Sequence, residues 1–368
     1  MSAEKVLMKG NDAIAEAAIR AGCTAYFGYP ITPQNELIAY MAKNMLEKSS
    51  QKLGRVFIQA ESETAAINMV YGASCAGARA MTSSSSPGIS LKQEGISYAA
   101  GADIPLVLVN VARGGPGLGS IAPAQSDYFQ STRGGGHGDY YCIVLAPKSV
   151  QECADLTYLA FDLADQYRMP VIILADGMVG QMMEGVELPP EKSPEDLPKR
   201  DWIVGGMKNR EARHITSINL VPAELEAKTK ARYERYELIK QKEIRFEASG
   251  GLAGGPADDI TLVAYGTSAR VCLGAKKLAE KEGIKVGIFR PITLWPFPYA
   301  ALAKIAETGN PILTVEMSLG QLVEDVKLAV LEADPKKPRA EVHLLGHSGG
   351  VIPTEEEVFA ELKRILKR

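Results

Sequence analysis

The sequence is poor in the residues that build metal centres and disulfide frameworks. Of its 368 residues, five are cysteine and four are histidine, and there is no Cys-x-x-Cys pair and no His-Glu-x-x-His motif. The cysteines are Cys23, Cys75, Cys142, Cys153 and Cys272. An odd number of scattered cysteines is typical of buried free thiols in a reducing compartment. We therefore expect neither a disulfide framework nor a metal or iron–sulfur site held by this chain alone.

A large net charge and long hydrophobic runs are also missing. The 41 Lys and Arg residues nearly balance the 44 Asp and Glu residues, for a net charge of −3. This balance argues against a general nucleic-acid binder, which carries a basic surface. No apolar run approaches the roughly 20 residues that a membrane helix needs, and residues 1–11 carry charges without an apolar signal segment. We therefore expect a cytoplasmic protein that binds neither nucleic acid nor membrane.

Short, continuously apolar runs alternate with stretches of helical periodicity along the first half of the chain. Strands that are apolar throughout are typical of a parallel sheet covered by helices on both faces. The sequence therefore predicts an α/β fold. The expected strands cover residues 25–29, 55–59, 80–82, 105–111, 143–147 and 171–174, and the expected helices cover residues 11–21, 35–45, 63–76, 89–100 and 150–167.

The length of the chain and a change in composition indicate two domains. We expect a first domain over residues 1–190, a linker over 191–255 and a smaller parallel-sheet domain over 256–368. The linker contains a charged helix over 222–246, which we interpret as a solvated bridge rather than an interaction helix, and a glycine-rich joint. The expected elements of the second domain are strands at 260–265, 285–289, 311–316 and 342–345, and helices at 268–282, 321–332 and 354–367.

Three polar or glycine-rich segments, residues 30–34, 83–88 and 114–138, follow predicted strands. Because ligands of parallel sheets bind beyond the carboxyl ends of the strands, we expect these segments to form a binding site. The chain has no Gly-x-x-x-x-Gly-Lys-Ser/Thr motif and no Gly-x-Ser-x-Gly motif, which excludes a P-loop and a nucleophile elbow. The glycines of residues 113–119 fit a flexible loop as well as they fit an anion cradle.

Three single residues stand out in or beside these segments. Glu63 lies at a helix start, where a carboxylate often makes only a cap or dipole contact, and Thr32 could also be a helix cap. Arg113 follows the most apolar strand, where an arginine must find an anion, either a carboxylate of the fold or one of a substrate. The residues alone leave both the structural and the functional interpretation open.

Taken together, the motifs resemble the alpha subunit of the 2-oxoacid:ferredoxin oxidoreductases, a thiamine diphosphate family. The resemblance rests on residues 28–33 (Gly-Tyr-Pro-Ile-Thr-Pro), 61–63 (Glu-Ser-Glu), 82–91 (Thr-Ser-Ser-Ser-Ser-Pro-Gly-Ile-Ser-Leu) and 113–116 (Arg-Gly-Gly-Pro), in that order. It implies a pyrimidine-type thiamine diphosphate-binding domain followed by a transketolase-C-terminal-like domain. Residues 93–98 and 134–139 are most similar to the branched-chain, 2-oxoisovalerate (3-methyl-2-oxobutanoate) subgroup.

The resemblance implies roles for the residues singled out above. The glutamate matching Glu63 would bond N1′ of the aminopyrimidine and favour the imino tautomer, as the catalytic and cofactor-binding residue. Thr32 and Arg113 would hold the carboxylate and keto oxygen of the substrate. Ser86, Pro87 and Gly88 would line the pyrimidine side of the cofactor or a subunit contact.

The resemblance also implies partners. The chain lacks the Gly-Asp-Gly motif of a diphosphate and Mg²⁺ site and lacks grouped cysteines for iron–sulfur clusters. A beta subunit would supply the first, and gamma and ferredoxin-like delta subunits would carry the second. We expect oxidative decarboxylation of branched-chain 2-oxoacids to acyl-CoA, with coenzyme A as acceptor and electrons passed to ferredoxin. The alternatives are a 2-oxoglutarate enzyme, in which Lys92 or Arg133 would hold a second carboxylate, and a non-catalytic structural subunit.

Overall fold

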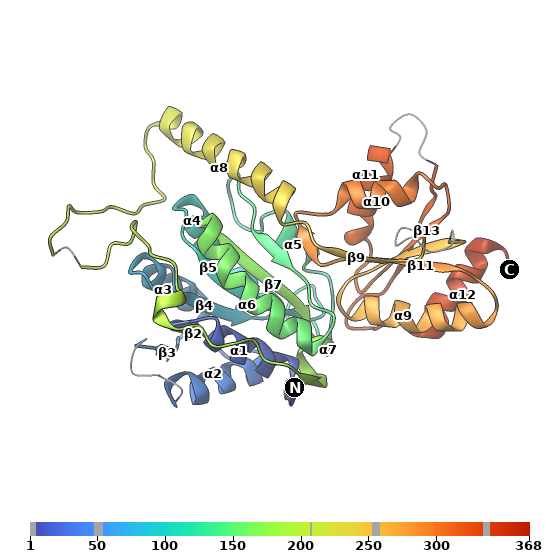
Figure 1. Cartoon of the computed structure of the whole chain (residues 1–368), viewed down its shortest axis with the longest axis horizontal. Helices are drawn as coiled ribbons and strands as arrows, with labels where there is room; N and C mark the ends of the chain where they lie inside the picture. The colour runs from blue at the N-terminus through green and yellow to red at the C-terminus, as the bar shows by residue number, and fades with distance from the viewer. Residues whose placement is uncertain (1–4, 48–53, 207, 252–257, 334–338) are drawn as a thin grey trace.

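The fold consists of two helix-covered sheets joined by a long helix (Figure 1). The computed structural model describes residues 5–47, 54–206, 208–251, 258–333 and 339–368. Most of the expected glycine-rich joint at residues 250–256 lies outside this description. Across the described part of the chain, no helix combines the length and apolar character that crossing a membrane requires.

The first sheet has seven strands in the order β12-β6-β7-β5-β4-β2-β3, and all of them except β12 run parallel. Its strands are β2 (Ala25–Gly28), β3 (Val56–Gln59), β4 (Ala80–Ser84), β5 (Leu106–Ala112), β6 (Ile143–Leu145), β7 (Pro170–Asp176) and β12 (Thr293–Trp295). Strand β5 is buried along its whole length. The α/β prediction is therefore confirmed, with the most apolar segment at the centre of the sheet.

Two groups of helices cover this sheet. The first group packs together as α1 (Gly10–Arg20), α2 (Asn35–Glu47) and α6 (Val150–Tyr167), and the second as α3 (Glu63–Cys75) and α4 (Ser86–Gly101). Because crossovers between parallel strands are right-handed, the strand order places the two groups on opposite faces. Further short elements are the helices α5 (Tyr128–Thr132) and α7 (Gly177–Gln181) and the antiparallel strand pair β1 (Val6–Lys9) and β8 (Met183–Val186).

The second sheet has five strands in the order β14-β13-β10-β11-β9. Its strands are β9 (Phe246–Ser249), β10 (Ile260–Val263), β11 (Val286–Pro291), β13 (Ile312–Glu316) and β14 (Val342–Gly346). Figure 1 shows α9 (Gly266–Lys281) and α12 (Glu355–Leu366) below this sheet, and α10 (Tyr299–Ala306) and α11 (Leu322–Ala333) above it. The first pair and the second pair each pack against one another.

The structure differs from the sequence-based expectations in three details. Each sheet is not purely parallel, because β12 and β9 add antiparallel edges. Residues 83–88 do not all lie between the strand and the helix, since β4 continues to Ser84 and α4 begins at Ser86, with Ser85 as the extended N-cap and proline in the first helical turn. Strand β12 also crosses the expected division at residue 256, because it pairs with β6 of the first sheet.

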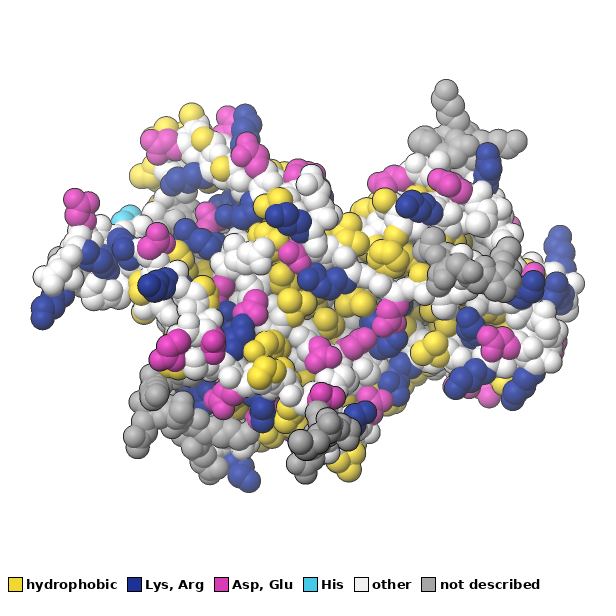
Figure 2. Space-filling model, viewed as in Figure 1, with side chains coloured by type: hydrophobic (Ala, Val, Ile, Leu, Met, Phe, Trp, Pro, Cys, Tyr) yellow, Lys and Arg dark blue, Asp and Glu magenta, His cyan; other side chains and the backbone are white. Residues whose placement is uncertain are grey.

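The charged helix, α8 (Pro222–Lys242), ends four residues earlier than expected. Most of it is exposed, and Figure 2 shows acidic and basic side chains interspersed over it. One strip is buried, and it contains Arg232, Tyr236 and Ile239. Tyr236 lies 5.4 Å from the ring of Trp295 in β12. The helix is therefore a bridge anchored on the junction of the two sheets, rather than a fully solvated one.

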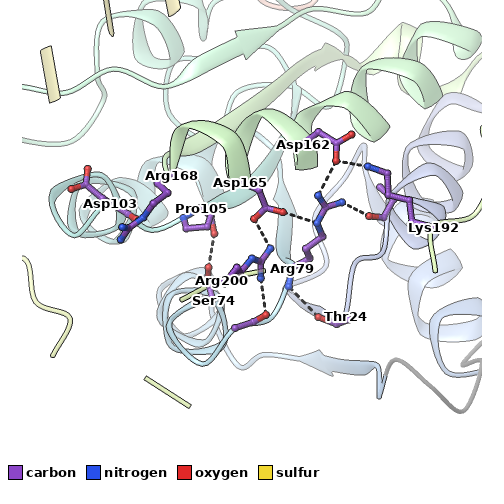
Figure 3. Close-up of polar contacts among 12 residues, drawn as sticks. Thr24, Ser74, Arg79, Asp103, Pro105, Asp162, Asp165, Arg168, Lys192 and Arg200 are labelled. Atoms are coloured by element: carbon purple, nitrogen blue, oxygen red, sulfur yellow. Dashed lines mark hydrogen bonds and ion pairs between the residues drawn. The ribbon is translucent and has the colours of Figure 1, made fainter. Parts of the chain in front are cut away.

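An extended segment after β8 is fixed near the amino ends of the strands by ion pairs, one of them buried and one partly exposed (Figure 3). Arg79 precedes β4, and its guanidinium donates to Asp162 at 2.8 Å and Asp165 at 2.7 Å, both on α6. From the segment itself, Lys192 pairs with Asp162 and Arg200 with Asp165. Because this cluster lies at the end of the sheet opposite to the polar loops, we interpret it as structural.

Candidate functional site

Four neighbouring parallel strands bring the predicted site residues to one edge of the first sheet. In the sheet order β5-β4-β2-β3, Arg113 directly follows β5 and Thr32 follows β2. Glu63 begins the helix after β3, and Gly88 lies in the first turn of the helix after β4. The carboxyl ends of parallel strands meet at the same edge, so residues about 80 positions apart converge here.

Glu63 is buried, with 7% of its surface exposed, and its carboxylate lies against Gly88. A Cβ placed on Gly88 would come within 2.7 Å of Glu63 Oε1 and 2.1 Å of Ser84 Oγ. Only a glycine permits this approach. The helix-cap interpretation does not account for Glu63, because Ser62 is the N-cap and its hydroxyl accepts from Ala65 N. The carboxylate is therefore held in the site without serving as the cap.

A buried lysine lies behind Glu63. Lys92, one turn after Gly88 on α4, has no exposed surface, and its ammonium donates to Thr82 Oγ1 at 3.1 Å. Burial lowers the pKa of Lys92 from 10.5 to about 8, although the charge of Glu63 acts in the opposite direction. The ammonium is thus an electrostatic neighbour of Glu63 that solvent does not reach.

Arg113 is 8% exposed and holds its guanidinium with neutral partners. Nη1 donates to Thr32 O at 2.9 Å and Nη2 to Leu118 O at 3.0 Å, while Nε is buried and has no hydrogen-bond partner. Among the described residues, no carboxylate forms an ion pair with this side chain. The expected anion of the fold is absent from these contacts, which leaves a buried positive charge beside Thr32.

Ser86 and Pro87 lie on the side of α4 next to Arg113. Ser86 Oγ accepts from Arg113 N at 3.0 Å and donates to Asp127 Oδ2 at 2.6 Å. Both residues line a cavity of about 480 Å³, which also includes Gly115, Asp127 and Ser318. The three residues 86–88 thus divide between two places: Gly88 lies at Glu63, and Ser86 lies at Arg113.

Several buried polar atoms of this edge have no hydrogen-bond partner within the described structure: Ser84 Oγ, Ser85 Oγ, Asn110 Oδ1 and Arg113 Nε. Buried polar atoms in proteins are nearly always paired, so a group of unpaired ones at a strand edge is typical of a ligand site. The part of the chain that is described contains no cluster of three or more His, Cys, Asp or Glu suited to a metal ion. All five cysteines are free and buried.

Two polar residues of this site did not stand out in the sequence. Asp127 contacts Ser86 across 41 positions, and no local pattern indicates such a contact. Asn110 lies inside the apolar run of β5 and donates to Asp127 Oδ2 at 2.8 Å. An asparagine within a fully buried strand requires a polar partner, and this requirement is the signal that could have identified it.

Comparisons with known proteins agree with this geometry. Residues 16–244 match the family described as "Pyruvate flavodoxin/ferredoxin oxidoreductase, thiamine diP-bdg", and residues 258–358 match "Pyruvate:ferredoxin oxidoreductase core domain II". Ketoisovalerate oxidoreductase subunit VorB of Methanothermobacter marburgensis is 47% identical over 98% of this chain and 97% of the relative. 2-Oxoglutarate synthase subunit KorA of Archaeoglobus fulgidus is 39% identical over 88% of this chain and 91% of the relative.

A solved structure with the same fold is the 2-oxoglutarate:ferredoxin oxidoreductase from Magnetococcus marinus with 2-oxoglutarate, coenzyme A and succinyl-CoA bound. It is 27% identical, with a TM-score of 0.83, and the match covers 98% of this chain but only 65% of the other. Both family models, the full-length relatives and the convergence of four strand ends thus agree with the resemblance seen in the motifs. The chain belongs to the family of thiamine diphosphate-dependent 2-oxoacid:ferredoxin oxidoreductases, as one of their subunits.

Proposed function

We propose that this chain is the aminopyrimidine-binding subunit of a 2-oxoisovalerate:ferredoxin oxidoreductase. The observation that carries the proposal is the meeting of Glu63, Gly88, Thr32 and Arg113 at the carboxyl ends of four adjacent strands. The reaction would convert a branched-chain 2-oxoacid and coenzyme A to an acyl-CoA and CO₂, with the electrons passed to ferredoxin.

The residues present fit a thiamine ring. Because Gly88 has no Cβ, the Glu63 carboxylate can lie against the first turn of α4, where a Cβ would meet Glu63 Oε1 at 2.7 Å. Ser84 Oγ and Ser85 Oγ lie next to this position, are buried, and have no protein partner in the described structure. A flat ring that carries donors and acceptors on its edge is a ligand that such a surface accommodates.

Each residue would contribute a separate part of the chemistry. When bound, the thiazolium ring supplies the electron sink that permits loss of CO₂ from a 2-oxoacid. Glu63 would bond the ring nitrogen N1′ and hold its proton. Arg113 would bind the substrate carboxylate, since its guanidinium has no anionic partner of its own among the described residues. Arg113 Nη1 bonds the main-chain carbonyl of Thr32 itself, and the Thr32 hydroxyl accepts from Asn35 Nδ2 at 3.3 Å. We therefore place this hydroxyl at the keto oxygen.

The surroundings of the site support a branched-chain substrate over 2-oxoglutarate. A second carboxylate on the substrate needs a second cation, and the two considered from the sequence are both engaged. Lys92 has no exposed surface and bonds Thr82, while Arg133 forms an ion pair with the buried Asp325 at 2.8 Å. VorB, with its ketoisovalerate name, is also more similar to this chain than the KorA subunit described above.

A partner would complete the site. The faces of α3 and α4 away from the sheet expose hydrophobic side chains: Met69, Leu91 and Tyr98. Leu91 is 56% exposed, although it lies one turn from the site. Apolar surface of this kind beside a half-built site fits a protein interface. We propose that a beta subunit covers it and supplies the diphosphate and Mg²⁺ site, and that gamma and ferredoxin-like delta subunits carry the iron–sulfur clusters.

The test is purification of the chain from co-expression with its candidate partner subunits. The complex is assayed for viologen or ferredoxin reduction with coenzyme A and a panel of 2-oxoacids. We expect reduction with 2-oxoisovalerate that requires thiamine diphosphate and Mg²⁺, and no reduction by this chain alone. Higher kcat/KM with 2-oxoglutarate would contradict the substrate assignment. A complex that oxidises no 2-oxoacid would contradict the proposed function and support the structural-subunit alternative.

A further inference from the structure

Arg113 is held by two separate sets of contacts. Its guanidinium bonds two carbonyl oxygens, of Thr32 and Leu118. Its main-chain N–H instead donates to Ser86 Oγ at 3.0 Å. The neighbouring residues Ala112 and Gly114 form backbone hydrogen bonds with Ala124 and Ala122, but the N–H of Arg113 itself donates to a hydroxyl of α4, the helix after the neighbouring strand β4.

The hydroxyl of Ser86 is in turn fixed by Asp127. Ser86 Oγ lies 2.6 Å from Asp127 Oδ2 and 3.2 Å from Arg113 O. A hydroxyl has one proton, and the shorter contact to a carboxylate is the stronger of the two. Ser86 therefore donates to Asp127 and keeps its lone pairs for Arg113 N. Asn110 of β5 donates to the same carboxylate oxygen at 2.8 Å, so Asp127 bonds both β5 and the start of α4.

The carboxylate of Asp127 does not cap the helix that Asp127 begins. Asp127 is the N-cap residue of α5, where an aspartate usually accepts from the first backbone N–H groups of its own helix. Here it makes no such cap bond. Its side chain turns to Ser86 and Asn110 instead, and burial raises its pKa although these two hydrogen bonds lower it. The Asp127 carboxylate thus bonds residues of the site and does not cap α5.

This arrangement holds Arg113 in place without neutralising the charge of its guanidinium. A carboxylate placed directly on the guanidinium would hold the side chain equally well, but it would neutralise the charge that a substrate carboxylate needs. Asp127 instead reaches the main chain of Arg113 through a neutral hydroxyl. Within the described residues, Asp127 and Arg113 make no ion pair.

We propose that Asp127 is a positioning residue for substrate binding, which acts on Arg113 through Ser86. The proposal rests on the proposed function, because it takes the anion at Arg113 to be the carboxylate of a 2-oxoacid. Loss of either side chain of the Asp127–Ser86 hydrogen bond would move the end of β5 and weaken substrate binding. It would leave the contact of Glu63 with Gly88, and hence kcat, largely unchanged.

The experiment uses the assembled complex loaded with thiamine diphosphate and measures KM and kcat for 2-oxoisovalerate. We expect D127A and S86A each to raise KM roughly tenfold, with kcat within about threefold of wild type. The double variant S86A/D127A should be no worse than either single variant, because both changes break the same chain of contacts. In an R113A background, D127A should add nothing. Asp139→Ala, at an exposed aspartate outside the cluster, is the matched control.

Conservative variants cover the case in which an alanine variant does not assemble. Asp127→Asn and Ser86→Thr keep the acceptor and the hydroxyl, so both should retain a KM within about threefold of wild type. Equilibrium binding of 2-hydroxy-3-methylbutanoate, which has the carboxylate but no keto carbon, should weaken in S86A and D127A as KM rises. The proposal is overturned if R113A raises KM while D127A and S86A do not, or if the effects of D127A and R113A add in full. A wild-type complex that oxidises no 2-oxoacid would instead refute the proposed function, and the role of Asp127 with it.

Discussion

The carboxylate of Glu63 lies against Gly88 on the side where other residues carry a Cβ. This contact joins the segment after β3 to the segment after β4. A Cβ at position 88 would meet Glu63 Oε1 at 2.7 Å and Ser84 Oγ at 2.1 Å. Distances this short can be relieved only by movement of the Ser84 and Glu63 side chains or of the helix start. The absence of a side chain at position 88 therefore sets where Glu63 lies.

Gly88→Ala should displace Glu63 and lower the affinity of the complex for thiamine diphosphate. We expect a roughly tenfold to hundredfold lower kcat/KM at limiting cofactor, since small displacements of a positioned group are costly. Cofactor titration of activity and of intrinsic fluorescence measures the effect. Gly72→Ala on α3 is the control: a Cβ at position 72 would meet no neighbouring atom of the described structure within 4 Å, so this change should be neutral or stabilising by up to about 1 kcal/mol. Equal cofactor affinity in both variants would contradict this account.

Glu63→Gln should abolish most of the activity without unfolding the chain. Glutamine has nearly the same shape but cannot exchange a proton with N1′, so we expect a rate loss of roughly a hundredfold or more. The control is Glu61→Gln, two residues earlier, where the carboxylate is exposed and contacts only the hydroxyl of Ser62 among the hydrogen bonds described. That variant should keep the wild-type rate. A Glu63→Gln complex with full activity would remove Glu63 from the chemistry.

Much of the fold was predictable from local patterns, because apolar runs and helical periodicity are local properties. Helix α6 begins and ends at the expected residues, 150 and 167, with Ser149 as its N-cap. Strand β12 was not predictable: it has three residues, comes from the second half of the chain and joins the first sheet through tertiary contacts alone. The antiparallel pair of β1 and β8 joins two segments from distant parts of the chain in the same way.

The candidate site shows the same limit. Thr32, Glu63 and Arg113 stood out because each follows a predicted strand, and parallel strands end at one edge. Gly88 was named through the family resemblance. The contact between Asp127 and Ser86 could not be predicted, since it depends on how the loop after β5 folds back over α4. The expectation for Arg113 was incomplete for a related reason. The sequence predicts an anion for Arg113, but it does not reveal that two neutral carbonyl oxygens hold the guanidinium while no carboxylate of the described residues pairs with it.

Arg79→Met should destabilise the first domain strongly. The guanidinium of Arg79 is nearly inaccessible and bonds Asp162, Asp165 and the carbonyl of Ala21 (Figure 3). Its removal leaves Asp165, with 6% of its side chain exposed, short of one partner. We expect a loss of about 3–5 kcal/mol, measured by urea unfolding with Trp202 fluorescence. Lys192→Met leaves Arg79 in place on the more exposed Asp162 and should cost less than about 1 kcal/mol. Similar losses in both variants would contradict the central position of Arg79.

Lys92→Met should stabilise the protein at neutral pH, and the gain should disappear at high pH. Burial lowers the pKa of Lys92 from 10.5 to about 8. Between these values the unfolded chain holds a proton that the folded chain lacks, so wild-type stability rises with pH across this window. The displacement corresponds to about 3 kcal/mol. Methionine has no such titration, so the difference in unfolding free energy between the variant and wild type should shrink by about 3 kcal/mol from about pH 7.5 to about pH 10.5.

Urea unfolding of both proteins at a series of pH values measures this difference, and groups that titrate equally in the two proteins cancel. Lys230→Met on α8 is the control, because the Lys230 side chain is 71% exposed and should give a difference that does not change with pH. A difference in unfolding free energy between Lys92→Met and wild type that does not change with pH would show that the ammonium keeps its ordinary pKa inside the fold. If the Lys92→Met complex is more stable but loses activity, the buried ammonium contributes to the function of Glu63, its neighbour in the site, and not to stability.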